Sequence, residues 1–363
     1  MKVLVWQWGR RGAGPRFAAC LAQGLSALPN VEAALALSAG AEILGTPDAP
    51  RCDLALPLYQ GFPGLAWRAL QAPVFVPALA RWVRRLAPAL AVCALPGPLD
   101  LLVLAALRSA RVPVAVVVHD AEAHPGDGYP LLYPLNRALV RRADGVVALT
   151  GHVTARLREQ GVLRPGVPLV RASHPPFAFG VAMPPGAHGG PVRVLSFGRL
   201  LPYKGLDLLA EALRRLGSRA DMTVRVVGHG PESPALDALR ALPGVAVENR
   251  WVPEEEIGAL IEWADLMVLP YREATQSGIA AAALAAGRPV IATHVGGLAE
   301  QLGGEPLATL CDPDPASIAA SMDRFLSTPP STGAGPDAVA AWRDFARAVL
   351  DGLRPLLFPP ERG

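Results

Sequence analysis

Two cations flank a glycine turn in the stretch VLSFGRLLPYKGLDLL, residues 194–209. Arg199 directly follows Gly198, and Lys204 comes five residues later, immediately before Gly205. Arginine can hold phosphate oxygens through two parallel hydrogen bonds, and lysine adds a compact point charge. The spacing therefore favours an anion site suited to a diphosphate. The alternative is a pair of solvated loop cations with no ligand.

The elements on either side must position these cations. An apolar run, Val192–Phe197, predicts a strand before the turn, and the periodic segment Leu206–Leu216 predicts a helix after it. A glycine turn that leads into a helix offers free backbone N–H groups and the positive end of the helix dipole. Glycine turns also follow Thr223–Val227, at Gly228, and Val290–Thr293. In a parallel α/β sheet all of these turns open at the carboxyl edge, where ligands bind.

The same alternation of apolar runs and helical segments fills the chain. It predicts strands at Val3–Trp6, Val31–Leu37, Leu90–Ala94, Val114–Val118, Gly145–Ala148, Leu169–Arg171, Val192–Phe197, Thr223–Val227, Val245–Asn249, Leu266–Leu269 and Val290–Thr293. It predicts helices at Phe17–Ala27, Leu99–Ser109, Leu206–Leu216, Pro234–Ala241, Pro253–Trp263, Ile279–Ala286 and Val339–Leu353. Strands separated by helices indicate parallel sheets covered on both faces.

The pattern runs twice, which predicts an α/β protein of two doubly wound, Rossmann-like domains. We expect an N-terminal acceptor-side domain at 1–175 and a hinge at 176–191, where proline, glycine and small residues dominate. We expect a donor-binding domain at 192–335. A C-terminal helix within 336–363 could pack back on the N-terminal domain.

Composition excludes several functional classes. The 363 residues are 51% hydrophobic with a net charge of +3, which indicates a globular protein and argues against nucleic-acid binding. Four well-separated cysteines, Cys20, Cys52, Cys93 and Cys311, suggest neither a metal site nor a disulfide framework. The N-terminal residues do not form a signal peptide, and no apolar run approaches the roughly 20 residues that span a bilayer. We therefore expect a cytoplasmic protein.

Several motifs occur in a fixed order: FGRLLPYKG, VVGHGP, WVPEEEIGALIEWADLMVLPY, SGIAAAALAAGRPVIAT and VGGLAE. Over residues 192–300 this set resembles the nucleotide-sugar-binding domain of GT-B, family 4 retaining glycosyltransferases. VVVHDAEAH, RRADGVVALTGHV and SHPPF extend the resemblance more loosely over 1–175. The resemblance implies two domains that face each other across a cleft. It also implies sugar transfer from a UDP- or GDP-sugar to a glycan or lipid-linked acceptor, with no metal and no other cofactor.

The resemblance also implies roles for residues of the second half. Arg199 and Lys204 match the cations that neutralise the departing diphosphate. The residues expected to contact the donor are Gly198, Arg199, Lys204, Gly228, Gln276, Ser277 and Gly278.

The family's E-x7-E motif departs from its pattern here. Its two glutamate positions fall on Ala274 and Ala282. Glu273 lies one residue from the first position and is the candidate to replace that glutamate, with a shifted turn. No acid replaces the second, so the mode of ribose binding stays open.

In the first half, the resemblance places His119 at the transferred sugar. Its imidazole could position a sugar hydroxyl, or its backbone carbonyl could stabilise charge at the anomeric centre. Asp120 and His124 are further acceptor-side candidates, as are Gly12 and Gly14 in the turn after the first strand. A histidine after a strand can equally be structural.

Two basic segments could meet a membrane. Residues 78–86 and 136–142 combine arginines with apolar side chains, as helices on anionic bilayers do. An ordinary amphipathic surface helix has the same pattern. Peripheral contact at the inner face of the cell membrane, in cell-surface glycan or polysaccharide assembly, therefore remains an expectation. The alternative functions are a non-catalytic nucleotide-sugar binder and a nucleotide-sugar epimerase on the same fold.

Overall fold

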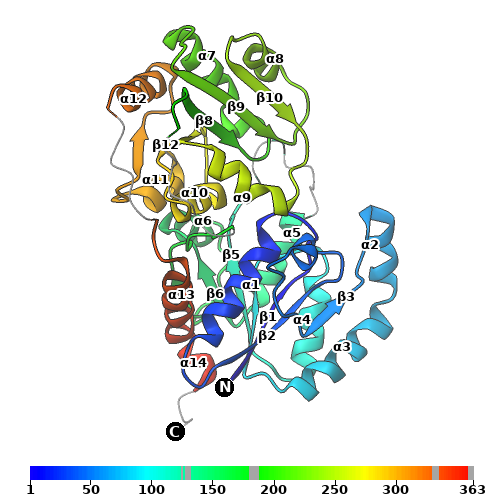
Figure 1. Cartoon of the computed structure of the whole chain (residues 1–363). Helices are drawn as coiled ribbons and strands as arrows, with labels where there is room; N and C mark the ends of the chain where they lie inside the picture. Colours follow the sequence, from blue (N-terminus) through cyan, green and yellow to red (C-terminus); the bar gives the residue numbers. More distant parts are fainter. Residues whose placement is uncertain (124–125, 127–131, 180–187, 329–334, 359–363) are drawn as a thin grey trace. The chain divides into compact units, whose positions relative to one another are not determined.

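The computed structural model describes residues 1–123, 126, 132–179, 188–328 and 335–358, and it divides into two compact units (Figure 1). Among the described residues, unit 1 holds 1–122, 132–173 and 339–358, and unit 2 holds the remainder, including Ala123 and Gly126. Each unit contains one parallel sheet with helices around it. The predicted fold class, two doubly wound α/β domains, is confirmed.

Unit 1 is built on seven parallel strands in the order β3-β2-β1-β4-β5-β6-β7. The strands are β1 (Lys2–Gln7), β2 (Glu32–Ser38), β3 (Leu54–Leu56), β4 (Leu90–Cys93), β5 (Val114–Val118), β6 (Gly145–Ala148) and β7 (Leu169–Arg171). The helices are α1 (Ala13–Ser26), α2 (Gly61–Leu70), α3 (Ala72–Leu86), α4 (Asp100–Ser109), α5 (Leu132–Arg142), α6 (Gly151–Glu159), α13 (Ala338–Gly352) and α14 (Arg354–Leu357). The strand order reverses between β1 and β4, where doubly wound sheets bind their ligands.

Unit 2 repeats this plan with six parallel strands in the order β10-β9-β8-β11-β12-β13. The strands are β8 (Val192–Phe197), β9 (Met222–Gly228), β10 (Val245–Asn249), β11 (Leu266–Leu269), β12 (Val290–Thr293) and β13 (Ala308–Cys311). The helices are α7 (Leu206–Leu216), α8 (Pro234–Arg240), α9 (Glu254–Trp263), α10 (Gly278–Ala285), α11 (Gly296–Leu302) and α12 (Pro315–Ser327). The corresponding reversal falls between β8 and β11.

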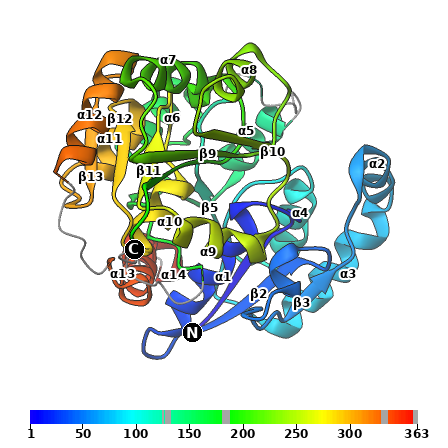
Figure 2. The same ribbon diagram turned by 45° about the horizontal axis from the view of Figure 1, so that its top comes forward.

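Apolar clusters cover both faces of the unit 2 sheet. Along β8, Val194 packs into one cluster and Leu195 into the other, and Val226 and Val227 alternate in the same way in β9. Helices α7, α8 and α12 supply the first cluster (Figure 2), and α9, α10 and α11 supply the second. Because both faces are buried, the strands are continuous apolar runs. Because helices cover both faces of the sheet, a ligand can reach it only at the turns that follow the strands.

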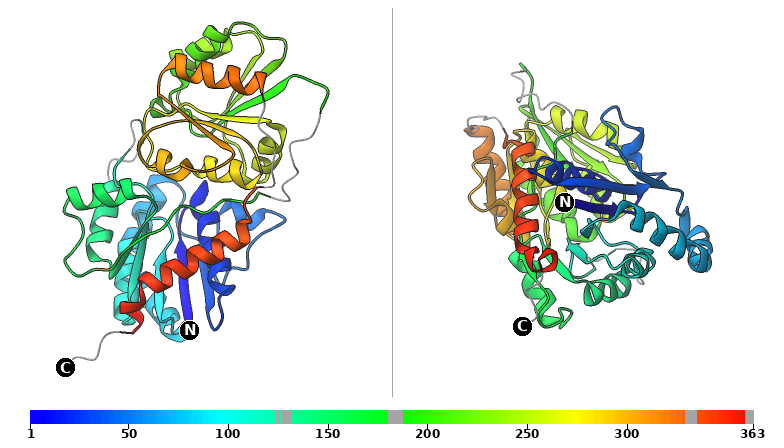
Figure 3. Two further views of the ribbon diagram at one scale, coloured as in Figure 1. Left: turned by 90° about the vertical axis from the view of Figure 1, so that its left-hand side faces the viewer. Right: turned by 90° about the horizontal axis from the view of Figure 1, so that it is seen from below.

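The helix near the C-terminus, α13, packs into unit 1 (Figure 3). The ring of Phe17 in α1 meets the rings of Trp342 and Phe345 edge-on, at centroid distances of 4.9 and 5.8 Å. All three aromatic side chains are buried. Unit 1 is therefore discontinuous in sequence, because its core includes residues from both ends of the chain.

The structure departs from the sequence prediction in several elements. It contains elements that were not predicted: the strands β3 and β13 and the helices α2, α6, α11, α12 and α14. Helix α1 begins at Ala13, so the predicted glycine turn before residue 17 is partly helical. Most of these elements are short or contain glycine or proline, which weakens the periodic signal.

The expectation that the apolar side chains of residues 78–86 contact a membrane is wrong. Leu79 and Val83 are buried in the core of unit 1, and Trp82 and Leu86 pack against it. Within the described ranges, no helix combines the length and apolarity needed to cross a bilayer.

Candidate functional site

The carboxyl ends of β8 and β9 bring two glycine turns together in unit 2. Gly198 donates its backbone N–H to Val227 at 3.1 Å, and Leu200 donates to His229 at 3.0 Å. A Cβ on Gly228 would lie 1.7 Å from the carbonyl oxygen of Gly198, so only glycine fits there. The turns predicted to bind the donor therefore run side by side at one sheet edge.

Two buried tyrosines hold the predicted cation pair. The Tyr203 hydroxyl accepts a hydrogen bond from Arg199 Nη2 at 2.7 Å. Lys204 Nζ lies 3.6 Å from the ring centroid of Tyr271 and 4.9 Å from that of Tyr203. Both tyrosines are less than 5% exposed, while Arg199 is exposed and Lys204 half-buried. The aromatic faces attract the ammonium group and fix its position before any anion arrives.

The same contacts continue to the start of α10. The Tyr271 hydroxyl lies 3.5 Å from Ser277 Oγ, which accepts a hydrogen bond from the Ala280 N–H and so caps the helix. Ser277 also donates its backbone N–H to Gln301. The structure thus gives the Ser277 hydroxyl a capping role, and its contact with the donor stays a prediction.

Gln276 and Gly278 lie on either side of this cap. Gly278 is the first residue of α10, at the positive end of the helix dipole. Gln276 is half-buried, and its Oε1 has no hydrogen-bond partner within the described residues. A buried amide oxygen without a partner costs free energy unless a ligand or water satisfies it.

The positions of the altered E-x7-E motif are packed rather than open. Ala274 is 5% exposed, and its carbonyl accepts the N–H of Gly297 at 2.9 Å. Ala282 is 1% exposed, inside α10. Glu273 is exposed. The structure therefore leaves Glu273 accessible, and its role stays a prediction.

In unit 1, His119 follows β5 but its side chain is buried. Its Nε2 donates to the Ala94 carbonyl at 2.8 Å, and its ring meets Phe17 edge-on at 4.6 Å. Burial lowers the pKa of His119 below its ordinary value, which keeps the imidazole neutral. The imidazole therefore packs in the core of unit 1. The backbone of His119, which directly follows β5, is the part of this residue that lies at the strand end.

The remaining acceptor-side candidates lie near two strand ends. Gly12 is the N-cap residue of α1, and Gly14 lies in its first turn, where a Cβ would meet the Gln7 amide at 2.8 Å. Asp120 follows β5 and is half-buried. His124 lies outside the described residues.

The buried carboxylate of Asp100 accepts hydrogen bonds from residues near the ends of both β1 and β4. It accepts hydrogen bonds from Trp6 Nε1 at 3.0 Å, the Gly97 N–H at 2.7 Å and Cys93 Sγ at 3.3 Å. Burial raises the pKa of Asp100 to about 6, against these hydrogen bonds. Burial, followed by the adjacent carboxylate, also raises the pKa of the Cys93 thiol well above its ordinary value.

Asp100 should make stability depend on pH. Because its pKa is raised from 3.8 to about 6 in the folded chain, the folded state binds this proton more tightly than the unfolded state. The resulting stabilisation is complete below pH 3.8 and disappears as pH rises through about 6. The shift corresponds to about 3 kcal/mol in the free energy of unfolding.

Urea unfolding of the wild type and Asp100→Asn across this range measures the effect. The difference between the two should change with pH, whereas Asp351→Asn, at an exposed position in α13, should follow the wild type. A constant difference between wild type and Asp100→Asn would contradict the raised pKa.

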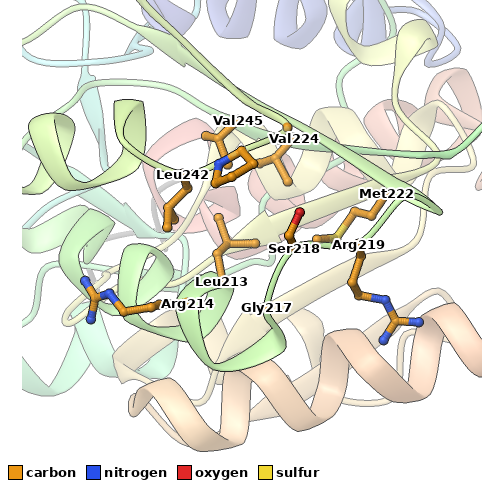
Figure 4. A pocket seen from close by; sticks show the side chains of 11 residues that line it. Leu213, Arg214, Gly217, Ser218, Arg219, Met222, Val224, Leu242 and Val245 are labelled. Atoms are coloured by element: carbon orange, nitrogen blue, oxygen red, sulfur yellow. The ribbon is translucent and has the colours of Figure 1, made fainter.

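A cavity of about 190 Å³ lies elsewhere in unit 2, at the amino ends of β9 and β10 (Figure 4). Met222, Val245 and Leu213 are among its apolar lining residues. The two arginines of the lining already form ion pairs, Arg214 with Glu211 and Arg219 with Asp221 and Asp323. This cavity is at the opposite edge of the sheet from Arg199 and Lys204, so it is separate from the predicted donor site.

Sequence reasoning missed the two tyrosines that contact the cation pair. Tyr203 immediately precedes Lys204, and Tyr271 follows β11 after a proline. Their positions, beside a cation and after a strand, could have indicated that they belong to the site. Their joint contact with Lys204 depends on tertiary packing between the β8 and β11 turns and could not be derived from spacing.

Each of the two units matches a known protein family. Residues 12–172 match the family described as glycosyl transferase 4-like domain, and residues 191–328 match that described as glycosyl transferases group 1. Both halves of the chain are glycosyltransferase domains. The matches fall on unit 1 and unit 2 respectively, so Arg199 and Lys204 lie in the group 1 domain.

The alignments with individual relatives cover only part of this chain and part of each relative. The 2-deoxystreptamine glucosyltransferase of Streptomyces kanamyceticus is 29% identical over 55% of this chain and 56% of the relative. The D-inositol 3-phosphate glycosyltransferase of Frankia alni is 36% identical over 46% of each chain. The aligned part thus spans about half the length of these curated relatives.

The fold is shared over nearly the whole chain with solved structures. Anabaena Alr3699/HepE, solved in complex with UDP and glucose, superposes with a TM-score of 0.62 at 16% identity and covers 98% of both chains. Together with the two sheets, this likeness establishes the GT-B fold for this pair of glycosyltransferase domains.

Proposed function

We propose that this chain transfers a sugar from a UDP- or GDP-sugar to a glycan or lipid-linked acceptor, with retention at the anomeric carbon. The observation that carries the proposal is the cation pair at the carboxyl edge of the unit 2 sheet. Arg199 and Lys204 are both positioned by Tyr203, beside the start of α10. The UDP in the HepE structure supports a nucleoside diphosphate as the donor's leaving group.

In this proposal the cations act on the bond that breaks. As the sugar leaves the donor, negative charge grows on the β-phosphate oxygen, and preorganised donors at that oxygen lower the barrier. Lys204 supplies a fixed charge and Arg199 a directional pair of N–H groups. Gln276 binds a donor hydroxyl through its amide, which would satisfy its Oε1. These groups supply the charge that a divalent ion would otherwise provide, so the reaction needs no metal.

Unit 1 contributes the acceptor side. Because the His119 imidazole is buried against Phe17 and Ala94, its role at the transferred sugar is through the backbone carbonyl. Asp120 accepts a hydrogen bond from the acceptor hydroxyl. The enzyme acts in cell-surface glycan assembly in the cytoplasm, at the inner face of the membrane when the acceptor is lipid-linked.

A donor screen tests this function. We expect UDP or GDP, in the presence of a metal chelator, to raise the melting temperature, and the matching nucleotide-sugar to be consumed when acceptor is added. Consumption that requires a divalent ion would overturn the metal-free mechanism. Binding without turnover across an acceptor panel would instead indicate a non-catalytic binder, and release of an isomerised sugar would indicate an epimerase.

A further inference from the structure

A closed network of hydrogen bonds joins the neighbouring strands β1 and β4 at their carboxyl ends. The side chains of Trp6 in β1 and Cys93 in β4 both donate to Asp100, from Nε1 at 3.0 Å and from Sγ at 3.3 Å. On the main chain, Ala94 donates its N–H to the Trp6 carbonyl at 3.0 Å. We call these four residues the Asp100 network. Each of them is at most 1% exposed, so bulk water does not compete for their hydrogen bonds.

Asp100 accepts three hydrogen bonds with its two carboxylate oxygens. Trp6 donates to Oδ1, whereas Cys93 and the Gly97 N–H, at 2.7 Å, donate to Oδ2. Gly97 lies in the turn between β4 and α4, so the carboxylate also holds this turn. A carboxylate accepts at both oxygens, but the amide of asparagine has one oxygen and one NH2 group. Asp100→Asn therefore keeps the shape of the side chain but places a donor against the N–H of either Trp6 or Gly97.

The Asp100 network also fixes the side chain of His119, which follows β5. The Ala94 carbonyl accepts a hydrogen bond from His119 Nε2 at 2.8 Å, and Ala94 directly follows Cys93 in the chain. On another side, the ring of Phe17 packs edge-on against the imidazole at a centroid distance of 4.6 Å. Because close-packed interiors transmit displacements, a shift of Ala94 would move the imidazole and the backbone of His119 with it.

We propose that Asp100 is a positioning residue for sugar transfer, which fixes the Ala94 carbonyl and through it the orientation of His119. The inference rests on the proposed function, in which the backbone carbonyl of His119 acts at the transferred sugar. Asp100 is 1% exposed, so it acts through Ala94 and His119 and not by contact with a substrate. A displacement of about 1 Å at a reacting centre can lower a rate by about 10².

Steady-state kinetics of Asp100→Asn measure the effect on transfer. We expect kcat to fall by about tenfold to a hundredfold. The KM for the donor, and the rise in melting temperature with UDP or GDP, should stay at their wild-type values, because the proposed donor residues lie in unit 2. A general loss of folded protein would instead reduce nucleotide binding in proportion to activity.

Two substitutions of Cys93 test the same network with the carboxylate in place, and so also serve if Asp100→Asn does not fold. Cys93→Ala removes one donor to Asp100 and should lower kcat by about threefold to tenfold. Cys93→Ser keeps a donor, its O–H group, and should restore kcat toward the wild-type value. Equal kcat values for the alanine and serine variants would contradict the role of this hydrogen bond.

Chemical modification of histidine tests the link to His119 without any turnover. Diethyl pyrocarbonate acylates accessible imidazoles, and the His119 side chain is buried in the wild type. In Asp100→Asn, mass spectrometry should show that His119 reacts at least about tenfold faster, because local opening exposes it more often. His152, which is exposed in α6, is the internal reference and should react equally in both proteins.

Asp144→Asn is the matched control in the same unit. The Asp144 carboxylate accepts the Val114 N–H at 2.9 Å, so it also joins two segments, but at the amino end of β5. This variant should keep the wild-type kcat and the wild-type modification rate of His119. The proposal fails if Asp144→Asn lowers kcat as much as Asp100→Asn does, or if Asp100→Asn leaves kcat or the His119 rate unchanged. A wild type that transfers no sugar would overturn the proposed function instead, and the His119 rates would still report the link to Asp100.

Discussion

Replacing Lys204 with alanine is expected to lower kcat/KM for sugar transfer by about 10²–10³. The substitution removes the ammonium group that the rings of Tyr203 and Tyr271 hold at the carboxyl edge of the unit 2 sheet. Nucleoside diphosphate should then no longer raise the melting temperature. The folded structure should persist, because Lys204 is half-buried and its ring partners remain packed. Transfer assays and thermal-shift titrations measure the two effects.

Chemical labelling of lysine gives a second measurement of nucleotide binding at Lys204. Lys204 is one of only two lysines in the sequence, and the other, Lys2, forms an ion pair with Glu32 at 3.4 Å in unit 1. A lysine-selective acylating reagent followed by mass spectrometry therefore reports on one residue in each unit. UDP or GDP should protect Lys204 and leave Lys2 unchanged. Equal labelling of Lys204 with and without nucleotide would show that the diphosphate binds elsewhere. Lys2→Ala, as the matched control, should retain activity.

Gly205→Ala is expected to destabilise unit 2 by about 3–5 kcal/mol, through backbone strain and overpacking together. Gly205 has a φ of 64°, and a Cβ there would lie 1.9 Å from the Pro270 carbonyl oxygen. That close approach brings the Lys204 turn against the end of β11 and thus sets the Lys204–Tyr271 contact. Chemical denaturation should show the loss.

Gly217→Ala provides the control for this effect. Gly217 also has a positive φ, 73°, but a Cβ there would have no atom within 4 Å. Its cost should be backbone strain alone, about 1–3 kcal/mol, because its φ of 73° and ψ of 179° lie in a region that only glycine adopts readily. If both variants lose the same free energy of unfolding, the steric contact with Pro270 contributes nothing.

The sequence predicted most strands because buried parallel strands are continuous apolar runs. Val114–Val118 and Leu266–Leu269, for example, have the predicted bounds. The missed strands, β3 and β13, lie at the edges of their sheets and have half-exposed side chains, so they lack that signal. Helix α2 was missed because GFPGLAWRAL contains two glycines and a proline.

The sequence predicts a residue's place in the site when that place depends only on the neighbouring residues along the chain. Arg199 and Lys204 could be placed at the carboxyl edge of the sheet because each lies next to a glycine between a strand and a helix. The contact of Lys204 with Tyr271 could not, because it joins turns that are distant in sequence. Periodicity also could not decide whether the apolar side of residues 78–86 faces the sheet or a membrane. The packing of Leu79 and Val83 in the core settles that question.

The aromatic contacts of α13 have a consequence for how the protein is made. Phe17 emerges early from the ribosome, but Trp342 and Phe345, which cover it, are synthesised more than three hundred residues later. The first unit to be translated is thus the last to close its core, while unit 2 has nearly all of its residues beforehand. During that interval Phe17 lacks the rings of Trp342 and Phe345, and transiently uncovered apolar surface of this kind makes folding intermediates prone to aggregate.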